Sequence, residues 1–210
     1  VLDLFGIKPD YDLDVMQPGQ DLFDVTSNVL LGMREVLVDS SPDLVLVHGD
    51  TTTTMAVSLA AFYLQIPVGH VEAGLRTYNL RSPFPEELNR QFTSRVTDYH
   101  FAPTKQAMSN LLAEDVSEKQ IIVTGNTVID ALLSIVDEAR KTSFSEKLLK
   151  LLPFLAGCSL PRIVLVTGHR RENFGVGFEN ICQALYDLAG MHPVVQIIYP
   201  VHLNPNVQEP

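Results

Sequence analysis

The chain alternates between short apolar runs and longer segments whose apolar residues recur at helical spacing. The short runs predict strands over 44–48, 66–72, 99–102 and 121–124. The first of them is apolar on both faces, as parallel strands buried between helix layers are. The longer segments predict helices over 19–39, 51–65, 85–96, 104–113 and 128–140. This order predicts an α/β fold with a doubly wound sheet, in which the carboxyl ends of the strands share one edge.

The alternation stops after residue 140 and starts again at residue 162. Residues 141–161 combine a polar patch, a short Leu-rich turn, Pro153, Gly157 and Pro161, which favours a connection between domains. A strand, a helix and a strand are then predicted over 162–167, 176–189 and 194–200. We expect two Rossmann-like domains: an N-terminal one over 1–150 whose first strand is missing, a linker over 151–161, and the start of a C-terminal one over 162–210. The first residue is Val1 and no closing element precedes Pro210, so we expect a piece of a longer protein.

Composition narrows the functional classes. A hydrophobic content of 46% in 210 residues is enough for a core, and no run approaches the roughly 18 apolar residues of a membrane span. The two cysteines have neither metal nor disulfide spacing, which favours the cytoplasm. A net charge of −10 argues against general nucleic-acid binding, so an anionic ligand needs local cations. The candidates for that role are Arg76, Arg81, His169, Arg170, Arg171 and His202.

The segment 163–173 (IVLVTGHRREN) carries the strongest functional signal. An apolar strand ends there in a glycine followed by His169, Arg170 and Arg171. Anion-binding groups at the end of a parallel strand are the arrangement expected of a phosphate or nucleotide site. The alternative is that both arginines are simply solvated. His202 follows the next predicted strand and is expected at the same edge.

Acidic residues follow the earlier strands. Asp50 lies two residues after His48, so both face one ligand if the strand stays extended; the alternative is that Asp50 caps the next helix. Glu72 follows His70 in the same way, and its structural alternative is a pair with Arg76 or bonds to backbone amides.

Glu86 belongs to a third loop, where an acidic residue in a first helical turn needs no functional explanation. Carboxyl groups gathered near an anion site suit general acid–base chemistry, because burial and mutual repulsion separate their pKa values. The two His-x-acid pairs are also competent metal ligands, but their spacing matches no recognised zinc pattern, and we expect no metal.

Six blocks of sequence carry a resemblance to a known family: VHGDTTTT (47–54), HVEAGLRT (70–77), SPFPEELNR (82–90), TGNTVIDAL (124–132), TGHRREN (167–173) and YPVHLNPNV (199–207). Together, in this order and at these intervals, they resemble the non-hydrolysing UDP-N-acetylglucosamine 2-epimerases of bacteria. The blocks extend over nearly the whole chain. The resemblance implies two Rossmann-like domains facing each other over a cleft, as in GT-B glycosyltransferases.

The resemblance also implies a reaction. Members interconvert UDP-N-acetylglucosamine and UDP-N-acetylmannosamine, usually for cell-envelope polysaccharides, by eliminating UDP to a 2-acetamidoglucal and returning it. No cofactor is implied. Members are typically homodimers, and in several bacteria UDP-N-acetylglucosamine is also an allosteric activator.

By the family's motifs, Asp50, Glu72 and Glu86 match residues associated with proton transfer at C2 of the sugar, with acid and base not assigned among them. His169 matches a histidine near the UDP phosphates, where a cation or donor helps the leaving diphosphate. The substrate or activator pocket is matched by Gln17, Gln20, Arg170 and His202.

Two departures from the family pattern bear on activity. The family's N-terminal strand with its Gly-Thr-Arg-Pro-Glu loop and its later C-terminal segments are absent from these 210 residues. The alternatives are therefore an inactive or regulatory nucleotide-sugar-binding fragment and a hydrolysing UDP-N-acetylglucosamine 2-epimerase. A GT-B glycosyltransferase is less favoured, because its donor motifs differ.

Overall fold

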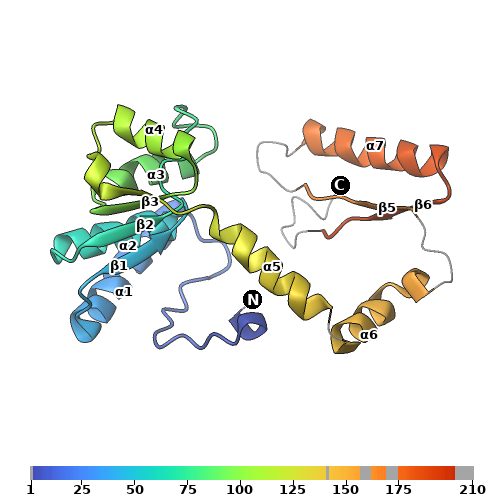
Figure 1. Ribbon diagram of the computed structural model, residues 1–210, viewed down its shortest axis with the longest axis horizontal. Coiled ribbons are helices and arrows are strands. Elements are labelled where there is room, and N and C mark those ends of the chain that lie inside the picture. The colour runs from blue at the N-terminus through green and yellow to red at the C-terminus, as the bar shows by residue number, and fades with distance from the viewer. Residues whose placement is uncertain (1, 141, 157–161, 169–174, 202–210) are drawn as a thin grey trace. The chain divides into compact units, whose positions relative to one another are not determined.

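The computed structural model describes residues 2–140, 142–156, 162–168 and 175–201 (Figure 1). The chain divides into two compact units, Val1–Asp130 and Ala131–Pro210. The domain limits at residues 150 and 161 stay a prediction.

The first unit is built on a four-stranded sheet in the order β1-β2-β3-β4. Its strands are β1 (Val45–His48), β2 (Val68–Val71), β3 (Tyr99–Ala102) and β4 (Ile121–Val123). All neighbouring strands run parallel, as predicted from the alternation of strands and helices. The loops that follow the strands therefore leave the sheet at one edge, where ligands of open α/β sheets bind.

Helices separate the strands of this unit in the predicted order. They are α2 (Thr52–Tyr63), α3 (Glu86–Arg95) and α4 (Lys105–Ala113), with α1 (Leu22–Ser40) before the first strand and short 3₁₀ turns η1 (Leu2–Phe5) and η2 (Glu118–Gln120). After the last strand, α5 (Thr127–Ala139) begins in this unit and continues into the second. Asp21 begins α1 with a capping box: its side chain accepts the Asp24 amide, and the Asp24 side chain accepts the Asp21 amide. Local sequence therefore sets where α1 starts.

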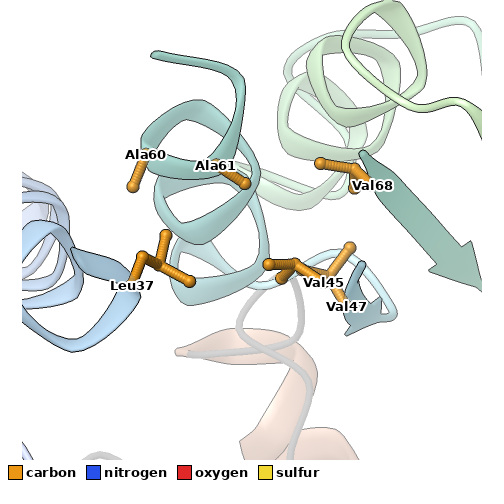
Figure 2. Packing of buried hydrophobic residues seen from close by; sticks show 6 residues of the cluster. All are labelled: Leu37, Val45, Val47, Ala60, Ala61 and Val68. Carbon is orange, nitrogen blue, oxygen red and sulfur yellow. The ribbon is translucent and has the colours of Figure 1, made fainter. Parts of the chain in front are cut away.

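Apolar side chains from α1, α2, β1 and β2 form one core cluster (Figure 2). Its buried members are Leu37, Val45, Val47, Ala60, Ala61 and Val68. The two alanines allow the backbone of α2 to approach the sheet closely, because a methyl group takes little space. This cluster fixes α2, and with it the β1–α2 loop.

The same face of the sheet becomes polar from β1 across to β3. Val47 on β1 is in register with His70 on β2, which is in register with His100 on β3. Both histidines are buried. On the opposite face Leu46, Tyr99 and Ile122 are exposed among the residues that the structure describes.

The second unit contains a parallel pair of strands, β5 (Arg162–Leu165) and β6 (Val195–Ile198), joined by α7 (Val176–Met191). This β-α-β unit confirms the strand, helix and strand predicted for this part of the chain. Before it come α6 (Thr142–Leu151) and η3 (Pro153–Ala156). The sequence predicts no helix at α6, but residues 146–151 (EKLLKL) are strong helix formers, which explains it. Within the described parts of the chain, every helix is too short or too polar to cross a membrane.

Candidate active site

The carboxyl ends of β1 and β2 bring the loops of Asp50 and Glu72 together. The Gly49 amide donates to the Val71 carbonyl at 3.0 Å, which joins the two loops directly after their strands. Gly49 has a φ of +74°, and a Cβ at this position would lie 3.5 Å from Oε2 of Glu72. The Glu72 carboxylate therefore lies against Gly49, the residue directly before Asp50.

Glu72 is held less tightly than a buried carboxylate would be. Its Oε2 lies 3.9 Å from Nε2 of His48, and 26% of its side chain is exposed. Its φ is +69°, a left-handed conformation that costs a non-glycine residue roughly 1–2 kcal/mol. This backbone geometry aims the carboxylate along the edge of the sheet, and a glycine would satisfy it at lower cost.

Asp50 and His48 have different partners, because the turn at Gly49 interrupts the extended strand between them. His48 lies near Glu72, whereas Asp50 pairs with Arg90. Nη2 of Arg90 on α3 donates to Oδ2 of Asp50 at 2.6 Å, and 30% of the Asp50 side chain is exposed. The alternative that Asp50 caps α2 is wrong: Thr51 is the N-cap, and its side chain accepts the Thr54 amide at 3.2 Å.

The backbone of the same turn is also held by side chains. Nε2 of His70 donates to the Gly49 carbonyl at 2.7 Å, which fixes the neutral tautomer with its proton on Nε2. Nδ2 of Asn89 donates to the Asp50 carbonyl at 2.9 Å. Groups from β2 and α3 thus fix the turn that carries Asp50.

Glu87 anchors the loop that follows β2. Its carboxylate is fully buried and accepts the amides of Thr77 and Tyr78, each at 3.0 Å, and Nε2 of Gln91 at 2.7 Å. Burial alone would raise the pKa of Glu87, but these hydrogen bonds and the nearby Arg90 guanidinium lower it below its ordinary value. The result is an ionised carboxylate beneath the site.

His70 and His100 are neutral side chains on a buried face of the sheet. Burial lowers the pKa of His70 from 6.5 to about 4, and the positive charge of Arg76 adds to the effect. Burial and the neighbouring His70 lower the pKa of His100 to about 4 as well. Neither histidine carries charge near neutral pH, so both serve as hydrogen-bonding groups.

Arg76 does not serve as a local cation for a ligand, contrary to the prediction, and it does not pair with Glu72. Its Nε and Nη2 donate to the two carboxylate oxygens of Glu114 at 2.7 and 2.9 Å. Nη2 also donates to Oγ of Ser94 at 2.8 Å, and the Arg76 side chain has no exposed surface. These hydrogen bonds join the β2–α3 loop, which carries Arg76, to α3 and to the end of α4.

The remaining predicted residues lie in different settings. Glu86 is half-buried in the first turn of α3, where the helix dipole favours a carboxylate. The Gln17 amide donates to Oε1 of Gln20 at 2.8 Å, and Nε2 of Gln20 donates to the Val15 carbonyl at 2.5 Å, so the Gln20 side chain closes a local loop. Gln17 is exposed and lines a pocket of about 280 Å³ beside α1.

The predicted anion-binding residues His169, Arg170 and His202 lie outside the described residues. The structure describes β5, which precedes His169 and Arg170, and β6, which precedes His202. The Tyr199 hydroxyl, directly after β6, donates to the Gly168 carbonyl, which follows β5. Their assignment stays a prediction.

Sequence reasoning missed Glu87, Asn89, Arg90 and His100. One signal was available: α3 (EELNRQFTSR) has only two large apolar residues, Leu88 and Phe92, although it packs against α2. A packed helix with so few apolar residues must also bury polar groups. The buried positions of α3 are indeed Glu87, Asn89, Thr93 and Ser94.

The arrangement supplies partly exposed carboxylates on a rigid, buried polar base. Such groups accept and donate protons, and the exposed fractions of Asp50 and Glu72 leave room for a ligand. Within the described part of the chain, no three or more histidine, cysteine or acidic residues lie close enough to hold a metal ion.

Comparison with known proteins identifies the family. The family model described as UDP-N-acetylglucosamine 2-epimerase matches residues 1–210. The UDP-N-acetylglucosamine 2-epimerases of Salmonella typhimurium and Escherichia coli K12 are 57% and 56% identical over the whole chain. The crystal structure of the Neisseria meningitidis UDP-GlcNAc 2-epimerase bound to UDP-GlcNAc is 50% identical over 99% of the chain, with a TM-score of 0.94.

The chain spans 56% of the length of each of these proteins. The structural match confirms the predicted α/β fold class with Rossmann-like parallel sheets of the GT-B type. The chain belongs to the UDP-N-acetylglucosamine 2-epimerase family.

Proposed function

We propose that this chain contributes the acid–base groups of an enzyme that interconverts UDP-N-acetylglucosamine and UDP-N-acetylmannosamine. The observation that carries the proposal is the meeting of Asp50 and Glu72 at one sheet edge, in a chain of this family. The Neisseria relative, named for this epimerase activity, has UDP-GlcNAc bound in its structure, which supports the choice of substrate.

In the proposed mechanism a carboxylate at the sheet edge removes the proton from C2 while the C1–O bond to UDP breaks. This leaves a 2-acetamidoglucal with a C1–C2 double bond. UDP then adds back to C1 through its phosphate oxygen, and C2 takes a proton on the opposite face from a second carboxylic acid. No electrons are gained or lost overall, so the reaction needs no oxidant or cofactor.

Asp50, Glu72 and Glu86 are the proposed proton-transfer groups, and His169 is proposed to stabilise the leaving diphosphate. Arg170, His202, Gln17 and Gln20 are proposed to bind the substrate or an activating second molecule of UDP-N-acetylglucosamine. The proposal includes a homodimer in the cytoplasm that serves cell-envelope polysaccharide synthesis, as the family resemblance implies.

Proton NMR of the full-length protein that contains this chain, with UDP-N-acetylglucosamine in D₂O, tests the proposal. We expect UDP-N-acetylmannosamine to appear with deuterium at C2, and Glu72→Gln to slow this exchange at least tenfold. The matched control is Glu118→Gln, because Glu118 is an exposed glutamate in η2.

Other products would replace the proposal with a rival. Free N-acetylmannosamine rising together with UDP would indicate a hydrolysing epimerase. Calorimetric binding of UDP-N-acetylglucosamine without any C2 exchange would indicate a nucleotide-sugar-binding protein.

A further inference from the structure

Arg90 connects two carboxylates that have different surroundings. Its Nη2 lies 2.6 Å from Oδ2 of Asp50, and its Nη1 lies 3.6 Å from Oε2 of Glu87. Glu87 is fully buried, whereas the Asp50 side chain is 30% exposed. The guanidinium is thus fixed from the inside of the protein and presents its other end to the site.

Glu87 cannot move aside, because it is itself held by the Thr77 and Tyr78 amides and by Gln91. The contacts Asp50–Arg90–Glu87 therefore link the β1–α2 loop, helix α3 and the β2–α3 loop. A shift of any one loop would be transmitted to the Asp50 carboxylate.

Stability alone is a poor explanation for an arginine at this position. Its side chain is 11% exposed, and its Nε has no hydrogen-bond partner among the residues that the structure describes. A buried donor without a partner costs about 1–3 kcal/mol, and buried ion pairs are often no better than apolar packing. Directional control of the Asp50 carboxylate is the feature that an apolar side chain would not provide.

The contact also leaves part of Asp50 available. Arg90 binds a single carboxylate oxygen, Oδ2, while Asn89 holds the Asp50 backbone carbonyl at 2.9 Å. Main chain and side chain of Asp50 are therefore both fixed from α3, and an exposed carboxylate surface remains for a ligand.

We propose that Arg90, held by Glu87, is the positioning residue that fixes the Asp50 carboxylate for proton transfer at C2 of the sugar. This inference rests on the proposed function. Misplacing a reacting group by about 1 Å costs on the order of 10²-fold in rate. Arg90 itself touches no reacting atom, so its loss should reduce kcat and leave KM nearly unchanged.

The variants Arg90→Gln and Arg90→Lys test it in two ways. The first is turnover: we expect Arg90→Gln to lower kcat by 10- to 100-fold, with Arg90→Lys recovering part of the loss because it keeps the charge. The second needs no activity. Three-bond couplings from the Asp50 carboxyl carbon report its χ1 angle, and we expect one rotamer in the wild type and averaged couplings in Arg90→Gln.

Arg95→Gln is the matched control, because Arg95 is an exposed arginine on the same helix. The positioning role is overturned if Asp50 keeps a single rotamer in Arg90→Gln, or if that variant turns over at the wild-type rate. Absence of C2 exchange in the full-length wild-type protein that contains this chain would overturn the proposed function instead, and the couplings would still decide the role of Arg90. If Arg90→Gln does not fold, Arg90→Lys carries the same measurement.

Discussion

His70 on β2 and His100 on β3 are in register on neighbouring parallel strands, and each residue is only 1% exposed. Two imidazoles that adjoin in a buried layer cannot both carry a proton without strong repulsion and loss of hydration. The protein therefore keeps both neutral, and His70 uses its Nε2 proton to hold the Gly49 carbonyl.

Acid should destabilise the first unit through these histidines. Their pKa is about 4 in the folded protein, whereas the ordinary pKa of histidine, 6.5, applies in the unfolded chain. Between pH 4 and pH 6.5 the unfolded chain therefore binds more protons than the folded protein. Stability is then present above pH 6.5 and is lost as the pH falls towards 4, by up to roughly 3 kcal/mol per histidine. Urea unfolding at pH 7 and pH 4.5 measures the loss.

His100→Gln should lose less stability than the wild type between these two pH values, because one titrating group is gone. His192→Gln is the control, since His192 is exposed. An equal loss in the wild type and His100→Gln would show that the buried pair does not cause the acid sensitivity.

Gly74→Ala should destabilise the protein by about 3 kcal/mol or more. Gly74 has a φ of +86°, and a Cβ there would lie 2.3 Å from the Ala107 carbonyl oxygen, a backbone atom of α4 that cannot rotate away. Gly125→Ala is a matched control, because its φ is +83° and nothing lies within 4 Å of its Cβ position. Conformational strain alone should cost Gly125→Ala about 1–2 kcal/mol. Similar urea midpoints for both variants would contradict the clash.

The order of elements was predictable from sequence because buried strands and amphipathic helices differ clearly in apolar spacing. The same pattern placed Asp50 and Glu72 at one edge, since parallel strands end together. The partners of these groups were not predictable. Arg90 lies 40 positions after Asp50, and only the packing of α3 brings the two together.

The partner of Arg76 could not be predicted from the sequence either. A cation in a loop after a strand is as compatible with a ligand as with a structural ion pair. Its partner Glu114 is 38 positions away, at the end of α4, so the choice depends on tertiary contacts that no local pattern reports. The helix α6 differs from the prediction for another reason: Pro153 and Gly157 favour a loop after it, whereas the helix propensity of residues 146–151 determines the structure before them.

Arg76→Lys should cost about 1–3 kcal/mol of stability, although it keeps the charge. A lysine ammonium cannot reproduce the paired hydrogen bonds to both Glu114 oxygens or reach Ser94 at the same time. Arg140→Lys is the control, because Arg140 and Asp137 form a pair whose side chains are each 76% exposed, and exposed pairs contribute little. Equal effects of the two substitutions on the urea midpoint would contradict the structural role assigned to Arg76.

Glu87→Gln should cost about 2–4 kcal/mol and loosen the loop after β2. The carboxylate accepts the Thr77 and Tyr78 amides through different oxygens, and a glutamine offers a single acceptor oxygen in place of the two. The substitution also leaves Arg90 without its one fully buried negative partner among the described residues.

Hydrogen exchange separates this local effect from general destabilisation. The Thr77 and Tyr78 amides should exchange faster in Glu87→Gln than in the wild type, while the amides of the β1 strand keep their protection under the same conditions. Glu118→Gln, at an exposed position in η2, should change neither exchange nor the urea midpoint. Unchanged exchange at Thr77 and Tyr78 would mean that backbone geometry alone holds this loop. Faster exchange would show that a single buried carboxylate holds the β2–α3 loop.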